Sequence, residues 1–273
     1  MFSYVVQLII ILAVFFVATK IDFGINHRSE KEKPSVGRLV YWIVIIFLVF
    51  TLLLTMSIYI LTHHVSFLPS VLMVTNWLIT YFLFKFGLTV LKPGWRPIVA
   101  ILSASLILAM ELRFPHHWLM INLSSAIMCA FFLVFFKRIS FWQTIVIAIG
   151  CTAYDVWAVW GTQQMLTLSK YSQGLQTAIS VPTGANSLFQ LGAGDIIFPG
   201  LAVMMAINFA RKVQKPLLAY AALTGYAIGY FLTVLAVIIT GNPQPATIYL
   251  FPSIFALFLL AARRENVLRS IWP

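Results

Sequence analysis

The sequence predicts an all-α polytopic membrane protein, a class indicated by its composition and by the length of its apolar runs. Of its 273 residues, 61% are hydrophobic and 9% are charged, against roughly 25% charged residues in soluble domains. Short polar breaks divide almost the whole chain into apolar runs near the ~20 residues that a membrane-spanning helix needs. The runs are continuously apolar, whereas the strands of a membrane β-barrel alternate. We therefore expect residues 1–273 to form a single integral membrane domain.

Nine of these runs are predicted to be transmembrane helices, the fourth being the shortest. Residues 1–136 hold the first five, and residues 139–273 hold the last four. The predicted spans are 2–19, 39–61, 68–91, 97–111, 118–136, 139–161, 190–210, 216–240 and 245–262.

Lysine and arginine determine the expected orientation, because positively charged loops stay in the cytoplasm. Of the 18 basic residues, fifteen follow odd-numbered spans, Lys85 lies within the third span, and only Arg113 and Lys170 lie on the opposite side. This bias predicts an N-terminus outside and a C-terminus in the cytoplasm. The bases flank apolar runs and do not interleave with aromatic residues on a soluble surface. The expected partner is thus the lipid bilayer of a cell membrane, and not nucleic acid.

The longest outer connection links the sixth predicted span to the seventh and is rich in Ser, Thr and Gln. Within it, "TAISV" (177–181) reads as a short extended segment that Pro182 ends. An irregular polar loop is the alternative interpretation of this segment.

Two carboxylates lie inside the predicted spans, whereas Glu111 is placed at a span end. Asp155 follows Arg138 by 17 residues, which is about 25 Å along a helix. Asp195 is expected about a turn and a half inside the next span, which runs the opposite way. Consecutive antiparallel helices therefore bring Asp155 and Asp195 to similar depth in the outer half of the membrane.

Two neighbouring carboxylates in a low dielectric share one proton, because both cannot ionise easily. One then acts as a general base that activates water, and the other as a general acid that polarises a carbonyl, as in aspartic peptidases. Two alternatives remain at this point. The pair could hold two helices together by a hydrogen bond, or it could relay protons or cations.

Small residues and prolines surround the second carboxylate. Gly192 and Gly194 allow a peptide or a partner helix to approach the backbone closely. Pro199 and Gly200 are expected to loosen the helix and to favour a water-filled cavity over a sealed core.

The last two spans carry a packing motif and a proline-rich start. Gly225 and Gly229 form a GxxxG spacing that indicates close helix packing. In "NPQPATIYLFPS" (242–253), Pro243 and Pro245 suit the first turn of a helix. Alternatively, a non-helical "QPAT" lines the site on the same outer side as both aspartates.

Metal and disulfide sites lack the spacing that they require. There is no H-E-x-x-H motif, and the adjacent histidines at 63–64 and 116–117 suit interfacial solvation better than ligation of one metal. Cys129 and Cys151 fall inside apolar runs without a disulfide framework. We expect no metal and no cofactor.

Three segments resemble motifs of one family. "AYDVWAVWGT" (153–162) is similar to the YD motif, "LGAGD" (191–195) to the GxGD motif, and "QPATIYL" (244–250) to the PAL motif of the presenilin and signal peptide peptidase intramembrane aspartyl proteases. The resemblance covers the last three or four spans, carries the motifs in order, and agrees with the nine-span architecture of that family.

The resemblance implies a catalytic role for Asp155 and Asp195, carried by spans within 139–273, with 1–136 as a scaffold. Thr247 stands where the family usually has leucine, at a position of substrate contact. The residues implied to frame the pair are Tyr154, Gly192, Gly194, Pro245, Ala246 and Thr247.

The implied function is hydrolysis of peptide bonds within transmembrane segments, such as remnant signal peptides. A substrate helix would unwind near the pair and add as a strand to 177–181 and near Pro245. The charge bias matches the signal peptide peptidase branch, whose orientation is opposite to that of presenilins. The short loops favour a microbial, archaeal homologue that acts without accessory subunits, and a homo-oligomer is left open. The alternative function is a proton-coupled transporter or ion leak channel with Asp155 and Asp195 as its relay.

Overall fold

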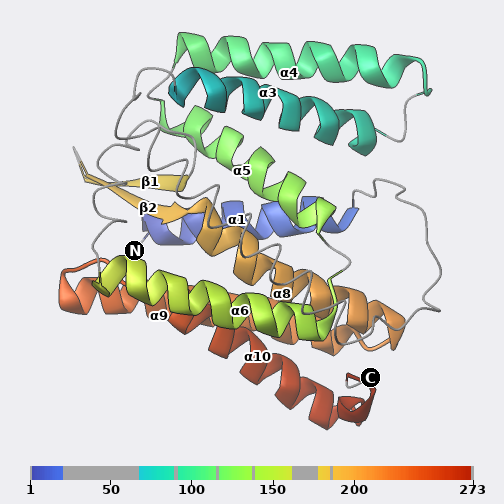
Figure 1. The fold of residues 1–273 in the computed structure, drawn as a ribbon, viewed down its shortest axis with the longest axis vertical. Coiled ribbons are helices and arrows are strands. Elements are labelled where there is room, and N and C mark those ends of the chain that lie inside the picture. Colours follow the sequence, from blue (N-terminus) through green and yellow to red (C-terminus); the bar gives the residue numbers. More distant parts are fainter. Residues whose placement is uncertain are drawn as a thin grey trace.

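The fold is that of a computed structural model (Figure 1). The predicted second span, 39–61, and Lys170 lie outside the described residues, as do the histidines at 63–64 and His116. The structure describes residues 2–20, 68–88, 92–114, 117–136, 139–161, 178–184 and 187–271.

The described part is mostly helical, and each of the other eight predicted spans corresponds to a helix. Seven of these helices are long and apolar enough to cross a membrane. A π-helical turn, η1 (Trp157–Gly161), continues α6, and a 3-10 turn, η2 (Leu268–Ser270), follows α10. The long helices are α1 (Phe2–Lys20), α3 (Leu68–Gly87), α4 (Trp95–Arg113), α5 (Trp118–Phe135), α6 (Phe141–Val156), α8 (Ala193–Lys212), α9 (Pro216–Thr240) and α10 (Thr247–Arg264).

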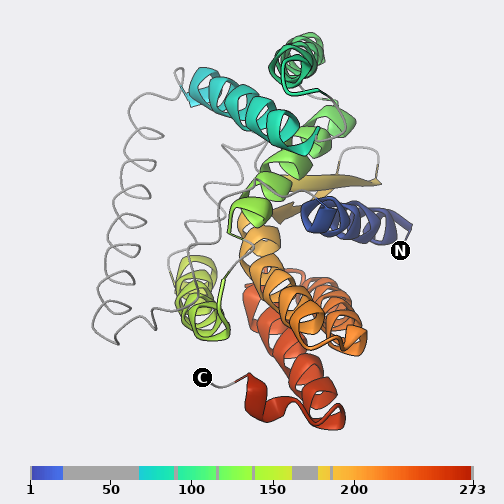
Figure 2. The same ribbon diagram turned by 90° about the vertical axis from the view of Figure 1, so that its right-hand side faces the viewer.

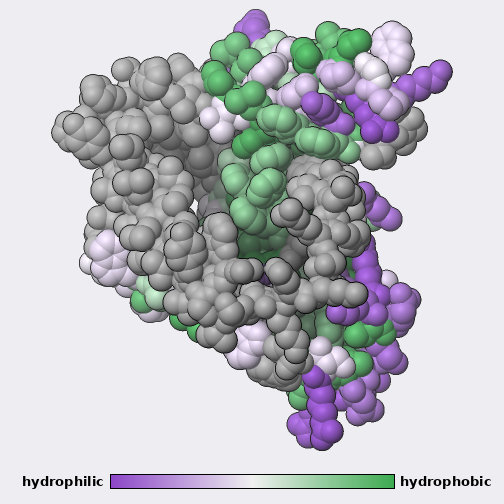
Figure 3. All heavy atoms as spheres, turned by 45° about the vertical axis from the view of Figure 1, so that its right-hand side comes forward, coloured by the Kyte–Doolittle hydropathy of each residue, from purple (hydrophilic) through white to green (hydrophobic). Residues whose placement is uncertain are grey.

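The helices are stacked in a continuous order from α4 to α10 (Figures 1 and 2). Helices α3 and α4 pack together at one edge, and α5 connects them to α1 and α8. At the other edge, α9 packs against both α8 and α10. The N- and C-termini lie at opposite ends of the helices (Figure 1). In Figure 3, hydrophobic side chains line the visible centre of the described surface, and hydrophilic ones gather at its upper and lower right.

A β-hairpin precedes α8. Strand β1 (Ala178–Gly184) pairs antiparallel with β2 (Ser187–Gly192), with Ala178 opposite Gly192. Of the strand expected at 177–181, residues 178–181 are confirmed as strand and not as an irregular loop. Pro182 does not end the strand, because it still pairs with β2.

The second strand also corrects the start of the seventh span. Helix α8 begins at Ala193 and not at residue 190, because the apolar residues that precede it belong to β2. Asp195 is consequently the third residue of the helix, in its first turn, and not a turn and a half inside it.

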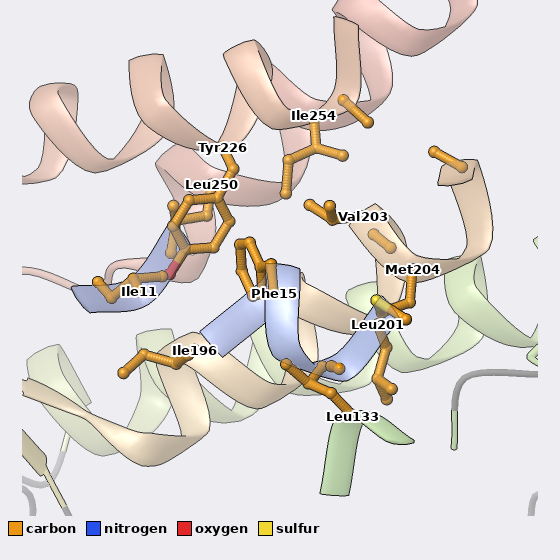
Figure 4. Close-up of a cluster of buried hydrophobic side chains, with 14 of the residues drawn as sticks. Ile11, Phe15, Leu133, Ile196, Leu201, Val203, Met204, Tyr226, Leu250 and Ile254 are labelled. Carbon is orange, nitrogen blue, oxygen red and sulfur yellow. The ribbon is translucent and has the colours of Figure 1, made fainter. Parts of the chain in front are cut away.

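The centre of α8 is tightly packed, so the expected water-filled cavity at Pro199 and Gly200 is wrong at this position. Both residues are buried within the helix. A Cβ at Gly200 would lie 2.8 Å from Cε1 of Phe15 and 2.9 Å from Cδ2 of Leu133. Figure 4 shows Phe15 of α1 and Leu133 of α5 beside α8. The glycine therefore allows three helices to meet, and does not loosen one of them.

Glu111 lies in the last turn of α4, at a span end as predicted, but its carboxyl group is buried. Its side chain is 1% exposed. Its Oε1 accepts a hydrogen bond of 2.8 Å from Nδ2 of Asn76 in α3 and another from the hydroxyl of Ser124 in α5. Polar side chains on two neighbouring helices thus provide the hydrogen bonds that a buried carboxyl group needs.

The GxxxG spacing in α9 packs against α10, as predicted. A Cβ at Gly225 would lie 2.6 Å from the backbone oxygen of Ser253, and one at Gly229 would lie 2.7 Å from Cα of Leu250. Real side chains essentially never approach backbone so closely, so only glycine permits this contact between α9 and α10.

Replacing Gly229 by alanine should push α9 away from α10 and lower the free energy of unfolding by about 1–3 kcal/mol, a typical cost of overpacking. The measurement is thermal unfolding of the purified protein in detergent. Gly150→Ala in α6 is the matched control, since a Cβ there meets nothing within 4 Å. Equal melting temperatures for the two variants would contradict the packing role of Gly229.

Candidate active site

Asp155 lies at the end of a regular helix. It is the last residue but one of α6, and its side chain is 8% exposed. Helix α6 begins at a capping box in which the side chains of Ser140 and Gln143 bond each other's backbone N–H groups. It passes directly into the π-helical turn at Trp157, and such turns occur frequently at functional sites.

Thr247 contacts the Asp155 carboxylate directly. Its backbone N–H donates to Oδ2 at 3.2 Å, and its hydroxyl donates to the same oxygen at 2.7 Å. Thr247 is the first residue of α10, and N–H groups in the first turn of a helix have no partner within the helix. The start of α10 therefore supplies both donors to Asp155.

The expectation of a non-helical "QPAT" is confirmed for residues 244–246, which precede α10. The alternative, with Pro243 and Pro245 in the first helical turn, is wrong. Pro245, Ala246 and Thr247 are all buried. Proline cannot donate a backbone N–H and favours an extended backbone before it, which delays the helix until Thr247.

Asp195 lies at the start of a helix. Gly192 is the N-cap of α8, and its backbone hydrogen-bonds the Asp195 carboxylate. A Cβ at Gly192 would lie 3.2 Å from Oδ2 of Asp195, so a side chain would crowd the carboxylate. Gly192 has φ of −59°, so this glycine is needed for space and not for its backbone conformation.

Gly194 differs from Gly192, because packing does not require it. The nearest atoms to a Cβ there belong to the Phe198 ring at 3.8 Å, an ordinary contact, and Gly194 itself is exposed. The backbone next to Asp195 is therefore accessible on this side.

The structure brings the two carboxylates together. Helices α6 and α8 pack against each other, and Asp155 and Asp195 lie close enough to interact electrostatically. Tyr154 interacts with Asp155, and its ring lies 6.2 Å from that of Trp157. Cys151, one turn before Asp155, lies within the field of both carboxylates.

Two further residues that the sequence analysis missed contact this region. The hydroxyl of Tyr226 in α9 lies 3.4 Å from the backbone oxygen of Asp195. The side chain of Gln7 in α1 is fully buried and donates to the backbone oxygen of Ile179 in β1 at 2.6 Å. A buried glutamine in an apolar span is a signal that a polar partner lies nearby.

Comparisons with known proteins agree with this architecture. A presenilin family intramembrane aspartate protease of solved structure superposes with a TM-score of 0.70 over 96% of this chain and 99% of its own, at 19% identity. The fold is therefore presenilin-like.

Sequence comparison defines the family. Residues 2–273 match the profile of the signal peptide peptidase family, and the chain belongs to it. Human signal peptide peptidase is 29% identical over 121 residues, which are 41% of this chain and 32% of that protein. Signal peptide peptidase-like 5 of Arabidopsis thaliana is 28% identical over 156 residues, 53% of this chain and 26% of that protein. The chain thus spans about a third or less of the length of these relatives.

Removing the hydroxyl of Thr247 tests its contact with Asp155. Thr247→Val keeps the shape but leaves the buried carboxylate with one donor fewer, and should lower the free energy of unfolding by about 1–3 kcal/mol. Thr233→Val in α9 is the matched control, since this buried hydroxyl bonds only a carbonyl of its own helix. Equal shifts in melting temperature in detergent would contradict a specific contact between Thr247 and Asp155.

Proposed function

We propose that this chain is an intramembrane aspartyl endopeptidase that hydrolyses peptide bonds within transmembrane segments. The observation that carries the proposal is the meeting of two carboxylates, the buried Asp155 at the end of α6 and the half-buried Asp195 at the start of α8. Membership of the signal peptide peptidase family supports it and does not favour a transporter or channel.

The two carboxylates have different hydrogen-bond donors, and this suggests a division of roles. Asp155 accepts two hydrogen bonds from Thr247, which stabilise a charged carboxylate. Asp195 has the backbone of Gly192 as its donor and lies in the field of Asp155. Asp155 is therefore the general base and Asp195 the carrier of the shared proton.

The proposed reaction balances through one tetrahedral intermediate. Asp155 takes a proton from the attacking water while Asp195 gives its proton to the carbonyl oxygen. The carbon–nitrogen bond then breaks, Asp155 passes its proton to the leaving nitrogen, and the hydroxyl proton returns to Asp195. Tyr154, Gly192, Gly194, Pro245, Ala246 and Thr247 frame this pair.

The proposed topology has nine transmembrane helices in the cell membrane, with the N-terminus outside and the C-terminus in the cytoplasm. Residues 1–136 form the scaffold and residues 139–273 the catalytic part of a single domain. The distribution of basic residues supports this orientation. The ion pair of 2.9 Å between Lys215, after α8, and Glu265, after α10, supports the placement of these two connections on one side of the membrane.

The proposed substrates are single-span segments with their N-terminus in the cytoplasm, such as remnant signal peptides. In this topology the aspartates lie near the outer ends of their helices, so the site opens toward the exterior. The name of the human relative, signal peptide peptidase, supports this substrate class.

The proposed strand addition of a substrate favours β2 over β1. Strand β1 packs on α5 and α1, and its Ile179 carbonyl already accepts from Gln7. Pro182 has no N–H and pairs with Leu188, so this pair does not use the ladder's hydrogen bonds. Because the two kinds of pair alternate, the backbone groups of Ser180 and Gln190 also point outward. The outward edge of β2 continues into Gly192 and the first turn of α8.

The dyad is tested by cleavage of a single-span substrate by the detergent-purified protein. Asp155→Asn and Asp195→Asn should each abolish product, because each removes one partner of the acid–base pair. Glu111→Gln is the matched control, since it neutralises a buried carboxyl group in a different part of the fold, and should retain cleavage. Product from either aspartate variant would contradict the proposed mechanism.

The strand edges are tested by proline, which removes one backbone N–H. Gln190→Pro should reduce cleavage severalfold, because it removes an outward donor from β2 that a substrate strand would use. Ser180→Pro removes the equivalent donor from the covered edge of β1 and should have a smaller effect. The reverse order of the two variants would assign the pairing edge to β1.

A further inference from the structure

A proline interrupts the hydrogen bonds of the turn that carries Asp195. In an α-helix, the N–H of residue i donates to the carbonyl of residue i−4. Pro199 lies four residues after Asp195 and has no N–H. The carbonyl of Asp195 therefore has no donor from its own i+4 position. In the membrane, a backbone carbonyl without a partner is costly, because water cannot replace the missing donor.

The hydroxyl of Tyr226 lies where that donor is missing. It approaches the Asp195 backbone oxygen to 3.4 Å from the neighbouring helix α9, and Tyr226 is 0% exposed. It is a hydrogen bond between helices at the first turn of α8, directly behind the catalytic side chain.

Packing holds the Tyr226 ring in place from two sides. Its ring meets that of Phe15 edge to face, with centroids 4.9 Å apart, as Figure 4 shows. The preceding residue, Gly225, brings the backbone of α9 against α10. Phe15 in turn lies against Gly200, one residue beyond Pro199. The position of the Tyr226 hydroxyl is thus fixed by packing among three helices, α1, α9 and α10.

We infer that Tyr226 is a positioning residue for Asp195, its hydroxyl replacing the backbone donor that Pro199 lacks. The first turn of α8 has one backbone hydrogen bond fewer than a regular helix, so its orientation depends on the contact with α9. Tyr226 therefore fixes the direction in which Asp195 faces Asp155 without touching the reacting atoms. This inference rests on the proposed function of the two aspartates.

A double-mutant cycle tests this inference, because the Tyr226 hydroxyl and a backbone N–H at position 199 should be interchangeable as donors to the Asp195 carbonyl. Tyr226→Phe keeps the ring and its contact with Phe15 but removes the hydroxyl. We expect it to lower kcat about five- to tenfold, the effect of about one hydrogen bond, with KM little changed. Pro199→Ala restores the backbone N–H, and in that background Tyr226→Phe should change kcat less than twofold. Tyr226→Phe should likewise lower the melting temperature more in the unmutated background than in the Pro199→Ala background.

Tyr230→Phe is the matched control. Tyr230 is another buried tyrosine of α9, and its hydroxyl contacts the Tyr4 carbonyl and Gln7, away from Asp195. Any change that Tyr230→Phe causes in kcat or melting temperature should be the same with and without Pro199→Ala. The reason is that the Tyr230 hydroxyl does not bond the Asp195 carbonyl that Pro199 leaves without a donor.

Two results would overturn the inference. One is an unchanged kcat in Tyr226→Phe, and the other is an equal loss in both backgrounds, which would indicate a general packing role. If the unmutated protein does not cleave, the proposed function fails and the positioning role fails with it. The melting temperatures of the cycle would then still report whether the hydroxyl replaces the missing backbone donor.

Discussion

The structure depends on bringing two carboxylates together in an apolar medium, where the protein must supply most of their hydrogen bonds. The fold meets this constraint by joining three helix ends at one place. Asp155 ends α6, Asp195 opens α8, and Thr247 opens α10. Helix starts offer unpaired N–H groups, which is why Thr247 and Gly192 can bind the carboxylates. Irregular backbone at membrane depth is tolerated only where protein covers it or it lines a cavity. The breaks in regular helix therefore belong to the site and are not accidents of the loops.

The remaining helices hold these three helix ends in fixed positions relative to one another. Gly225 and Gly229 draw α9 onto α10, so the start of α10 is fixed relative to Tyr226 and hence to Asp195. Helix α1 contributes from the opposite end of the sequence, through Phe15 against α8 and through Gln7 against β1. The hairpin and the first turn of α8 are thus tied to the same scaffold. A substrate strand that pairs with β2 would be aligned with Asp195 by covalent connection, because β2 continues directly into α8.

Sequence alone predicted what depends on length and chemical type. The spans followed from apolar runs, and the meeting of Asp155 and Asp195 followed from counting residues along two antiparallel helices. Features that depend on a partner from another helix were missed or misread. The burial of Glu111 requires Asn76 and Ser124. Pro199 and Gly200 suggested a water-filled cavity, but Phe15 and Leu133 fill the space beside Gly200. The apolar residues of β2 were indistinguishable from the start of a span. Thr247 was recognised only as a departure from leucine, whereas its hydroxyl contacts Asp155.

The central claim is that the two aspartates form one site for a tetrahedral intermediate. The most direct measurement is the binding of a hydroxyl-containing transition-state mimic of aspartic proteases to the purified protein, with Asp195→Asn beside it. The account predicts saturable binding by the unmutated protein, in competition with a single-span peptide, and its loss in the variant. Equal binding by both proteins, or no binding combined with a proton flux in liposomes that depends on Asp155 and Asp195, would contradict the account and favour a relay.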